Sequence, residues 1–440
     1  MNARTGSARH VRILAGAACA GILCPLASGA DDLVVFVHDQ IADEIIRMQD
    51  LNDDGDAHDP GEATVFFDDG PPVTGVDNAQ GMVALGPWTL LATDNFDPDN
   101  IVRLEDFDRD GDAFDAGEAS VWFSGTLPIG LAMTNPAELR LRSDGTFFLL
   151  DNNTLDTAVP EAIYILEDLN SDNDVDDPGE ITTFFELSPV GVSATTTFDA
   201  IEDNSGNVYV LDITDPSQIE SIDIIDPAGT SRTQWFDSVD LLNLAGMVLT
   251  GTVNELAHIA DTDEIVFGAS SGGGSQRIMA ARDRNESGTI DTPAELRLLW
   301  SESAHADGFN TGSPRDLFLT DDGRLLWTDG LADRVMMLTD LNADGDYNDA
   351  GETGVLYDAD TAVANGLPGI SLALSVTAAM DDACPADLAE PFGSLNFFDV
   401  AAFIGLYNAG DPGADLAEPF GSLNIFDVAA FIGLYNAGCP

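Results

Sequence analysis

Short stretches of alternating apolar and polar residues recur along the chain from Leu33 onwards, and turn residues bound each of them. They flank a recurring acidic segment on both sides. Those before it include 44–48, 101–104, 162–166 and 334–338, and those after it include 63–67, 119–123 and 181–185. Stretches of this length that are rich in aromatic and β-branched residues predict β-strands. Two Asp-Gly pairs, at 144–145 and 322–323, interrupt other apolar stretches and predict tight hairpin turns.

The acidic segment is itself a repeat. Its copies begin at Asp50, Asp106, Asp168, Asp283 and Asp340, so the steps between them are 56, 62, 115 and 57 residues. The longest step spans two periods, and the acidic pattern has decayed near 223–229, where the missing copy belongs. We therefore expect six units, each with four strands, in which the acidic segment joins the third strand to the fourth.

Four-stranded units at this period predict a mainly β fold, a six-bladed β-propeller over residues 31–380. The first unit begins with its second strand at Leu33, and a spare strand at 369–374 follows the sixth unit. The spare strand can therefore supply the missing innermost strand of the first unit. That pairing would close the ring and remove exposed strand edges. The alternatives are another number of blades and an irregular β-sandwich array.

Each acidic segment resembles the calcium loop of an EF-hand, with one residue added before the final Glu. Asp or Asn occupies positions 1 and 3, further oxygen-bearing side chains follow, and Glu stands at position 13. Hard oxygen ligands in this number suit Ca²⁺, which is the cofactor that we expect. The expected ligands are Asp50, Asn52, Asp54, Asp56, Asp59, Glu62, Asp106, Asp108, Asp110, Asp112, Asp115, Glu118, Asp168, Asn170, Asp172, Asp174, Asp177, Glu180, Asp283, Asn285, Glu295, Asp340, Asn342, Asp344, Asp346, Asp349 and Glu352.

The sixth position of each loop has to tolerate positive φ. Gly occupies it in four copies and Asn173 in the third, and Asn is the next best residue for that conformation. Because all the loops occupy the same connection on different blades, we expect calcium to be structural rather than catalytic. The alternative is a solvated acidic turn in a salt-adapted protein. It weighs most for the copy at Asp283, where Ser287 and Thr289 replace carboxylates.

The charge balance restricts the partners of the chain. It has 78 acidic residues and 16 basic ones, all of them Arg, and a formal net charge of −62. Such a field repels phosphate backbones and anionic lipids, so we expect no nucleic-acid partner. The acids are interleaved with apolar residues, which argues against disorder.

The first 30 residues predict a signal peptide. Arg4, Arg9 and Arg12 precede an apolar stretch at 13–26 and small residues at 27–30. A lipoprotein signal at Cys19 or Cys24 is the alternative. We expect an exported, secreted or cell-surface protein without a membrane span. The two remaining cysteines, Cys384 and Cys439, then predict a disulfide in an oxidising compartment.

Residues 386–410 and 414–438 are nearly identical and differ only at Phe397 and Ile425. Each copy predicts a loop followed by an amphipathic helix that starts near Asp399 or Asp427. The cysteine-bracketed duplication resembles a dockerin domain over 384–440, more narrowly the GC-type dockerin of exported planctomycete proteins. The resemblance implies a small all-α domain that docks to a cohesin-like or other cell-envelope protein.

The resemblance also implies calcium ligands in this domain. The matching positions are Asp387, Asn396, Asp399, Asp415, Asn424 and Asp427. Ala389 and Pro391, with Ala417 and Pro419, stand where the third and fifth ligands of the family belong. Calcium binding by these two loops therefore stays open.

Few residues point to catalysis. The histidines His38, His58, His258 and His305 are widely separated, and no helix is expected after the G-x-S-x-G match at 268–272. The sequence thus favours a displayed binding or scaffold protein over an enzyme. The alternative is a carbohydrate-active hydrolase, lyase or lactonase delivered by the C-terminal module. Acids converging on the propeller axis would favour the enzyme, and Asp203, Asn204 and Glu255 are candidates for that place.

Overall fold

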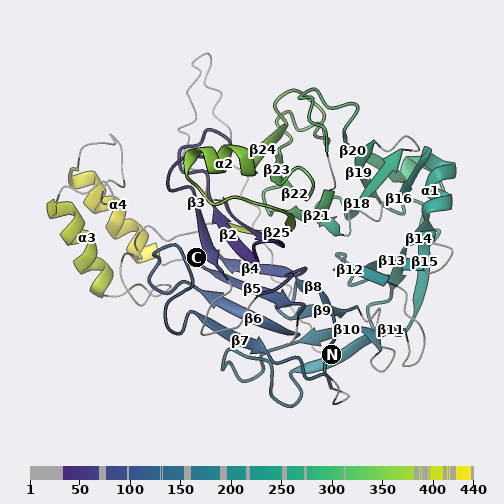
Figure 1. The fold of residues 1–440 in the computed structure, drawn as a ribbon, viewed down its shortest axis with the longest axis horizontal. Helices are drawn as coiled ribbons and strands as arrows, with labels where there is room; N and C mark the ends of the chain where they lie inside the picture. Colours follow the sequence, from purple (N-terminus) through teal and green to yellow (C-terminus); the bar gives the residue numbers. More distant parts are fainter. Residues whose placement is uncertain are drawn as a thin grey trace, which may run out of the picture.

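The computed structural model shows six antiparallel sheets arranged around a common axis (Figure 1). It describes residues 33–68, 76–96, 99–128, 130, 132–152, 160–188, 196–214, 219–249, 255–271, 275–311, 314–380, 386, 388, 395, 397–409, 414, 416 and 423–437. The predicted six-bladed β-propeller is confirmed. The expected signal peptide lies outside the described residues. In the described part of the chain, no helix has the length and apolarity needed to span a bilayer.

The strands of each blade follow one another from the axis outwards. Blade 1 contains β25 (Ala373–Met380), β1 (Leu33–Asp39), β2 (Glu44–Met48) and β3 (Ala63–Phe67). Blade 2 contains β4 (Met82–Gly86), β5 (Thr89–Asp94), β6 (Asn100–Glu105) and β7 (Ala119–Phe123). Blade 3 contains β8 (Pro136–Leu141), β9 (Phe147–Asp151), β10 (Glu161–Leu166) and β11 (Ile181–Ser188).

The second half of the ring has the same order. Blade 4 contains β12 (Thr196–Glu202), β13 (Val208–Thr214), β14 (Ile219–Ile225) and β15 (Arg232–Asp237). In blade 5, both β16 (Met247–Leu249) and β17 (Leu256–Ile259) pair with β18 (Glu264–Ser271), which is followed by β19 (Gln276–Ala281) and β20 (Leu296–Ser301). Blade 6 contains β21 (Pro314–Leu319), β22 (Leu325–Asp329), β23 (Arg334–Leu338) and β24 (Thr353–Asp358).

The ring closes as the sequence predicts, because β25 pairs antiparallel with β1 and sets Leu33 opposite Met380. The closing strand, however, begins at Ala373 and not at residue 369. The backbone N–H groups of Ser371 and Leu372 donate to the carboxylate of Asp39 at 2.7 and 3.1 Å. These residues therefore form the turn that leads into the strand.

Apolar side chains fill every junction between neighbouring blades. Successive side chains of a strand point to opposite faces, so Val34 and Phe36 of β1 pack toward blade 2 while Val35 and Val37 pack toward blade 6. Among the described residues, six buried clusters correspond to the six junctions. The alternating pattern of the sequence thus supplies both faces of each blade.

Two features differ from the repeat. Helix α1 (Ser238–Ala245) follows the last strand of blade 4, and the short β16 adds a fifth strand to the sheet of blade 5. Asp237 caps α1 by accepting the N–H groups of Val239 and Asp240, and Gly246 ends it at a φ of 70°. In blade 4, a tight turn joins β14 to β15, where Asp226 N–H donates to the carbonyl of Ser231. This is the unit in which the sequence lacks an acidic copy. The other short helices are η1 (Pro293–Glu295) and α2 (Ala359–Asn365).

The duplicated C-terminal segment forms two helices side by side (Figure 1), α3 (Phe397–Ala409) and α4 (Ile425–Ala437). Both are predicted, and both begin two residues before Asp399 and Asp427. Phe403 and Phe431 stack with ring centroids 4.1 Å apart and an interplanar angle of 8°. The predicted apolar stripes therefore pack mainly against each other. Cys384 and Cys439, and with them the expected disulfide, lie outside the described residues.

Candidate functional site

Charged side chains meet on the axis, where the six innermost strands face one another. In four blades, an acid holds the same place at the innermost strand. It directly precedes a residue that pairs with the second strand, and this pair lies at the same level in each of the four blades. These residue pairs are Leu139–Leu149, Ala200–Val210, Leu256–Phe267 and Leu317–Trp327. The acids are Glu138, Asp199, Glu255 and Asp316, and Ser375 and Gly81 hold the equivalent place in blades 1 and 2. The repeat thus sets four carboxylates at one level of the axis.

Arg140 of β8 joins three of these acids. Its Nη2 lies 3.0 Å from Oδ2 of Asp199 and 2.8 Å from Oε2 of Glu255, and its Nε lies 3.2 Å from Oε1 of Glu138. One oxygen from each of these three carboxylates lies within 4.8 Å of the others. The four acids are at most 6% exposed. We call Glu138, Arg140, Asp199, Glu255 and Asp316 the axial cluster; its acids are shielded from solvent, and its arginine is 17% exposed.

One guanidinium does not neutralise four carboxylates. Burial raises the pKa of Glu255 well above its usual range, and repulsion by Glu138 and Asp199 adds to the shift. Burial likewise raises the pKa of Glu138, although Arg140 opposes it. Burial raises the pKa of Asp316 to about 7. All three shifts favour the protonated form, so these carboxyl groups hold a proton more readily than exposed ones do and are suited to donating it.

Two cavities border the axial cluster. The smaller, of about 210 Å³, is lined by Gln40, Asn78, Gln80, Phe198, Glu255, Arg315 and Leu374. The larger, of about 640 Å³, is bordered by Arg140 and by the carboxyl ends of the inner strands. Glu255 therefore lines the smaller cavity, and Arg140 lines the larger one.

The sequence identifies one member of this cluster, Glu255. Asp203 and Asn204 lie elsewhere, on the wall of the larger cavity. Asp203 Oδ1 accepts the N–H groups of Ser205 and Asn207, and Asn204 Nδ2 donates to the carbonyl of Ala260 at 2.7 Å. These two side chains therefore brace turns. The missed acids carry a signal that is visible only when the units are compared, because each acid holds the same place on its innermost strand.

The acidic loops share one internal geometry. In all five, Oδ2 of the first Asp accepts the N–H of the sixth residue, as in Asp50 with Gly55 at 2.7 Å and Asp168 with Asn173 at 3.0 Å. The sixth residue has positive φ in every loop, 69° at Asn173 and 86–107° at the glycines, as predicted. The final Glu accepts the N–H groups of the second and tenth residues, as Glu62 does. It therefore closes the loop.

The loop at Asp106 differs in its third residue. In the other four loops an Asn donates its Nδ2 to an acid near the tenth position, as Asn52 does to Asp59 at 2.6 Å. Here Asp108 replaces the Asn and faces Asp115 without a donor, with both within a 4.8 Å group of acidic oxygens. The buried Oδ1 of Asp106 has no hydrogen-bond partner among the described residues. Burial raises the pKa of Asp106. Among the described loops, this one most needs a cation.

Each acidic loop also fastens its blade to the preceding one. The eighth loop residue donates its N–H to a carbonyl of the preceding outermost strand. The pairs are Ala57–Leu356 at 2.8 Å, Ala113–Phe66 at 2.7 Å, Val175–Trp122 at 2.9 Å, Ile290–Trp235 at 3.1 Å and Tyr347–Leu299 at 2.8 Å. The junction of blades 3 and 4, where the acidic loop is missing, is crossed by ion pairs from Arg140 to Asp199 and from Arg142 to Glu202.

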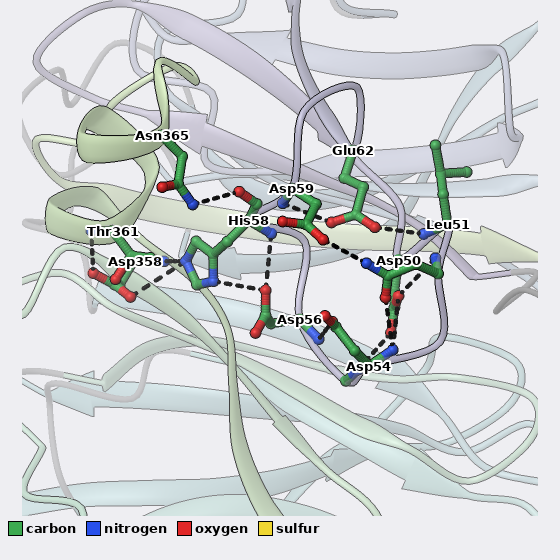
Figure 2. A network of polar contacts seen from close by, with 12 residues as sticks. Asp50, Leu51, Asp54, Asp56, His58, Asp59, Glu62, Asp358, Thr361 and Asn365 are labelled. Atoms are coloured by element: carbon green, nitrogen blue, oxygen red, sulfur yellow. Dashed lines mark hydrogen bonds and ion pairs between the residues drawn. The ribbon is translucent and has the colours of Figure 1, made fainter.

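The first loop reinforces the closing junction of the ring. Figure 2 shows His58 held between this loop and blade 6. Its Nδ1 lies 2.9 Å from Asp56 and its Nε2 accepts the N–H of Asp358 at 2.9 Å. Asn365 Nδ2 donates to the carbonyl of His58 at 2.8 Å, and the imidazole stacks on Tyr357. The acidic loop and the closing contact therefore form one network.

The C-terminal ligand set is described only in part. Asp387, Asn396 and Asp415 lie outside the described residues. Asp399 and Asp427 are fully buried, and each accepts a backbone N–H, from Leu388 at 2.9 Å and from Asn424 at 2.6 Å. These acids hold the helix starts in place.

Comparison with known proteins finds only weak structural similarity. No family model matches the chain, and no curated protein matches it. A Bacteroides thetaiotaomicron protein of unknown function is 12% identical, with a TM-score of 0.43 over 74% of this chain and 64% of its own length. A luciferin-regenerating enzyme is 13% identical, with a TM-score of 0.40 over 64% and 76%. The calcium-binding protein regucalcin from Agrobacterium tumefaciens is 11% identical, with a TM-score of 0.37 over 61% and 72%. The dockerin resemblance stays a prediction.

Proposed function

We propose that the chain is an acid–base hydrolase or lyase that acts on a small polar substrate at the propeller axis, with Glu255 as its proton donor. The observation that carries this proposal is the axial cluster, in which four buried carboxylates share one guanidinium. Buried titratable groups beside a cavity are typical of catalytic sites. The sequence favours a binding role, but acids on the axis are the feature that favours an enzyme.

The environments of the acids suit different tasks. The pKa of Glu255 is raised, so its protonated form can donate a proton to the leaving oxygen of an ester, lactone or glycoside. Asp199 accepts the N–H groups of Ala200 and Leu256 at 2.6 Å each, which suits a carboxylate. Arg140 is a positioning residue that contacts both acids and stabilises the Glu255 carboxylate once the proton has left.

Replacing Glu255 by Gln tests this role, because the amide keeps the shape of the side chain but donates no proton. We expect turnover to fall by about 10²-fold or more, the usual contribution of a general acid. The measurement is hydrolysis of a panel of sugar lactones and oligosaccharides by the full-length protein. Asp203→Asn, which removes an acid outside the cluster, is the control. Equal turnover by wild type and Glu255→Gln, or no turnover of any substrate in the panel, would contradict the proposal.

We infer that Ca²⁺ occupies the acidic loops as a structural ion. The oxygen donors fit it, and the loop at Asp106 gathers acidic oxygens whose repulsion a divalent cation would relieve. The fourth loop, at Asp283, has the fewest carboxylates. Because each loop also donates to the preceding blade, a bound ion would stabilise the junctions between blades.

We further propose that the chain is exported and that its C-terminal helices attach it to a cohesin-like or other envelope protein. The groove between α3 and α4, of about 250 Å³, supports attachment because Ile404 and Ile432 stay 52% exposed beside it. A display role without catalysis is the second candidate function, and it would use the same attachment. Cell fractionation tests it with Ile404→Asp and Ile432→Asp combined. Unchanged localisation of that variant would rule out attachment through this groove.

A further inference from the structure

An arginine, Arg315, lines the smaller axial cavity. Arg315 lies in β21, and its buried Nε has no hydrogen-bond partner among the described residues. In a chain with 78 acids, an arginine inside a cavity would be expected to pair with one of them. In the described lining of this cavity the acid is Glu255, which already contacts Arg140. The Nε–H of Arg315 is therefore available to a ligand.

The rest of the lining is suited to hydroxyl groups. Gln40, Asn78 and Gln80 each contribute a side-chain amide, and Nε2 of Gln40 donates to Oδ1 of Asn78 at 2.5 Å. The ring of Phe198 supplies an apolar wall. Amides both donate and accept hydrogen bonds, so together they can bind several hydroxyls of one molecule. A cavity of about 210 Å³ holds roughly seven water volumes at ~30 Å³ each, which suits a molecule of monosaccharide size.

We propose that this cavity binds a monosaccharide-sized sugar acid, with its carboxylate on Arg315 and its hydroxyls on Gln40, Asn78 and Gln80. The inference deepens the proposed function and rests on it for the chemistry at Glu255, but binding itself does not require turnover. A planar guanidinium binds a carboxylate through two parallel hydrogen bonds, which a neutral sugar does not offer.

The net charge of the protein gives this proposal a distinctive salt dependence. A field from −62 charges repels an anion approaching the surface, and salt screens that repulsion. The contact with Arg315 is inside a cavity and is screened much less. We therefore expect added salt to strengthen the binding of a sugar acid and to leave the binding of a neutral sugar unchanged.

Calorimetric titration of the full-length protein with D-glucuronate, D-glucose and acetate tests the proposal. We expect D-glucuronate to bind at least about tenfold more tightly than the other two, because each of them lacks half of the recognised groups, a difference of about 1.4 kcal/mol. Arg315→Gln should weaken D-glucuronate by about tenfold or more, and Arg315→Lys should weaken it less. Arg282→Gln, an exposed arginine that donates to the carbonyl of Thr262, removes the same charge outside the cavity and should change nothing.

Two results would overturn the proposal: D-glucuronate binding no tighter than D-glucose or acetate, or Arg315→Gln binding as wild type does. Melting curves of both Arg315 variants show whether they are folded, and Arg315→Lys retains the charge if Arg315→Gln does not fold. The titration also separates this proposal from the proposed function. D-glucuronate bound through Arg315 by a protein without turnover would refute catalysis at Glu255 and leave the sugar-acid site standing.

Discussion

Replacing Arg140 by Met is expected to lower the free energy of unfolding by about 3–5 kcal/mol at pH 8, because it leaves buried carboxylates without their cation. The loss should shrink at lower pH. Glu138, Glu255 and Asp316 have raised pKa values in the folded protein, so the folded state holds protons that the unfolded state has released. The stability of the wild type therefore falls as the pH rises from about 4 through 7. Without Arg140, this dependence becomes steeper.

Denaturant unfolding of both proteins at pH 5 and at pH 8, all in the same buffer salt, measures this effect. The control is Arg284→Met, whose side chain is 53% exposed and pairs with Glu264. Glu264 is buried but also pairs with Arg297, so the loss of the exposed Arg284 leaves it a cation and should cost only about 0–1 kcal/mol. If Arg140→Met were as stable as wild type at pH 8, the axial cluster would not depend on Arg140 for its charge balance.

Chelation of divalent cations is expected to lower the melting temperature by roughly 10 °C or more. A ligand bound only by the folded state contributes about 2.7 kcal/mol per site at a hundredfold excess over Kd, and 1 kcal/mol shifts the melting temperature of a domain above 150 residues by about 2–4 °C. Calcium would act at the loops that join neighbouring blades, so its loss should weaken several junctions at once.

Loop variants separate the sites in thermal melts with and without chelator. Asp340→Ala should reduce the calcium dependence more than Asp283→Ala, because the loop at Asp283 has fewer carboxylates. Asp108→Asn gives the second loop the Asn–Asp closure found in the others and should stabilise the protein when calcium is absent. Identical melting curves with and without chelator in moderate salt would refute a structural role of calcium.

The architecture follows from the sequence because its signals are local and repeated. Alternating strands, a fixed period and a spare closing strand predict six blades, and the positions of Gly and Asn173 predict the loop conformation. The axial cluster is a long-range feature. Arg140 and Glu255 are 115 residues apart in sequence, and only the ring geometry brings them together. Helix α1 follows the outermost strand of blade 4 as α2 follows that of blade 6, and because the other four blades lack such a helix, the period of the repeat predicts neither.

The acids of the inner strands were recognisable only in comparison with one another. Glu138-Leu139, Glu255-Leu256 and Asp316-Leu317 are the same acid–apolar pair at the same strand level. Each alone resembles an ordinary surface acid at a strand end. These acids are identified when the units are aligned by their innermost strands and not by their acidic loops.

The most direct test of the axial site is infrared detection of protonated carboxyl groups in the folded protein. The carbonyl stretch of a carboxylic acid is measured at about pH 8 in wild type and in Glu255→Gln, where groups with a pKa near 7, such as Asp316, are mostly ionised. The account predicts a carboxylic-acid band in wild type that is lost or clearly reduced in Glu255→Gln. A difference spectrum without that band would contradict the account, because Glu255 would then hold no proton to donate.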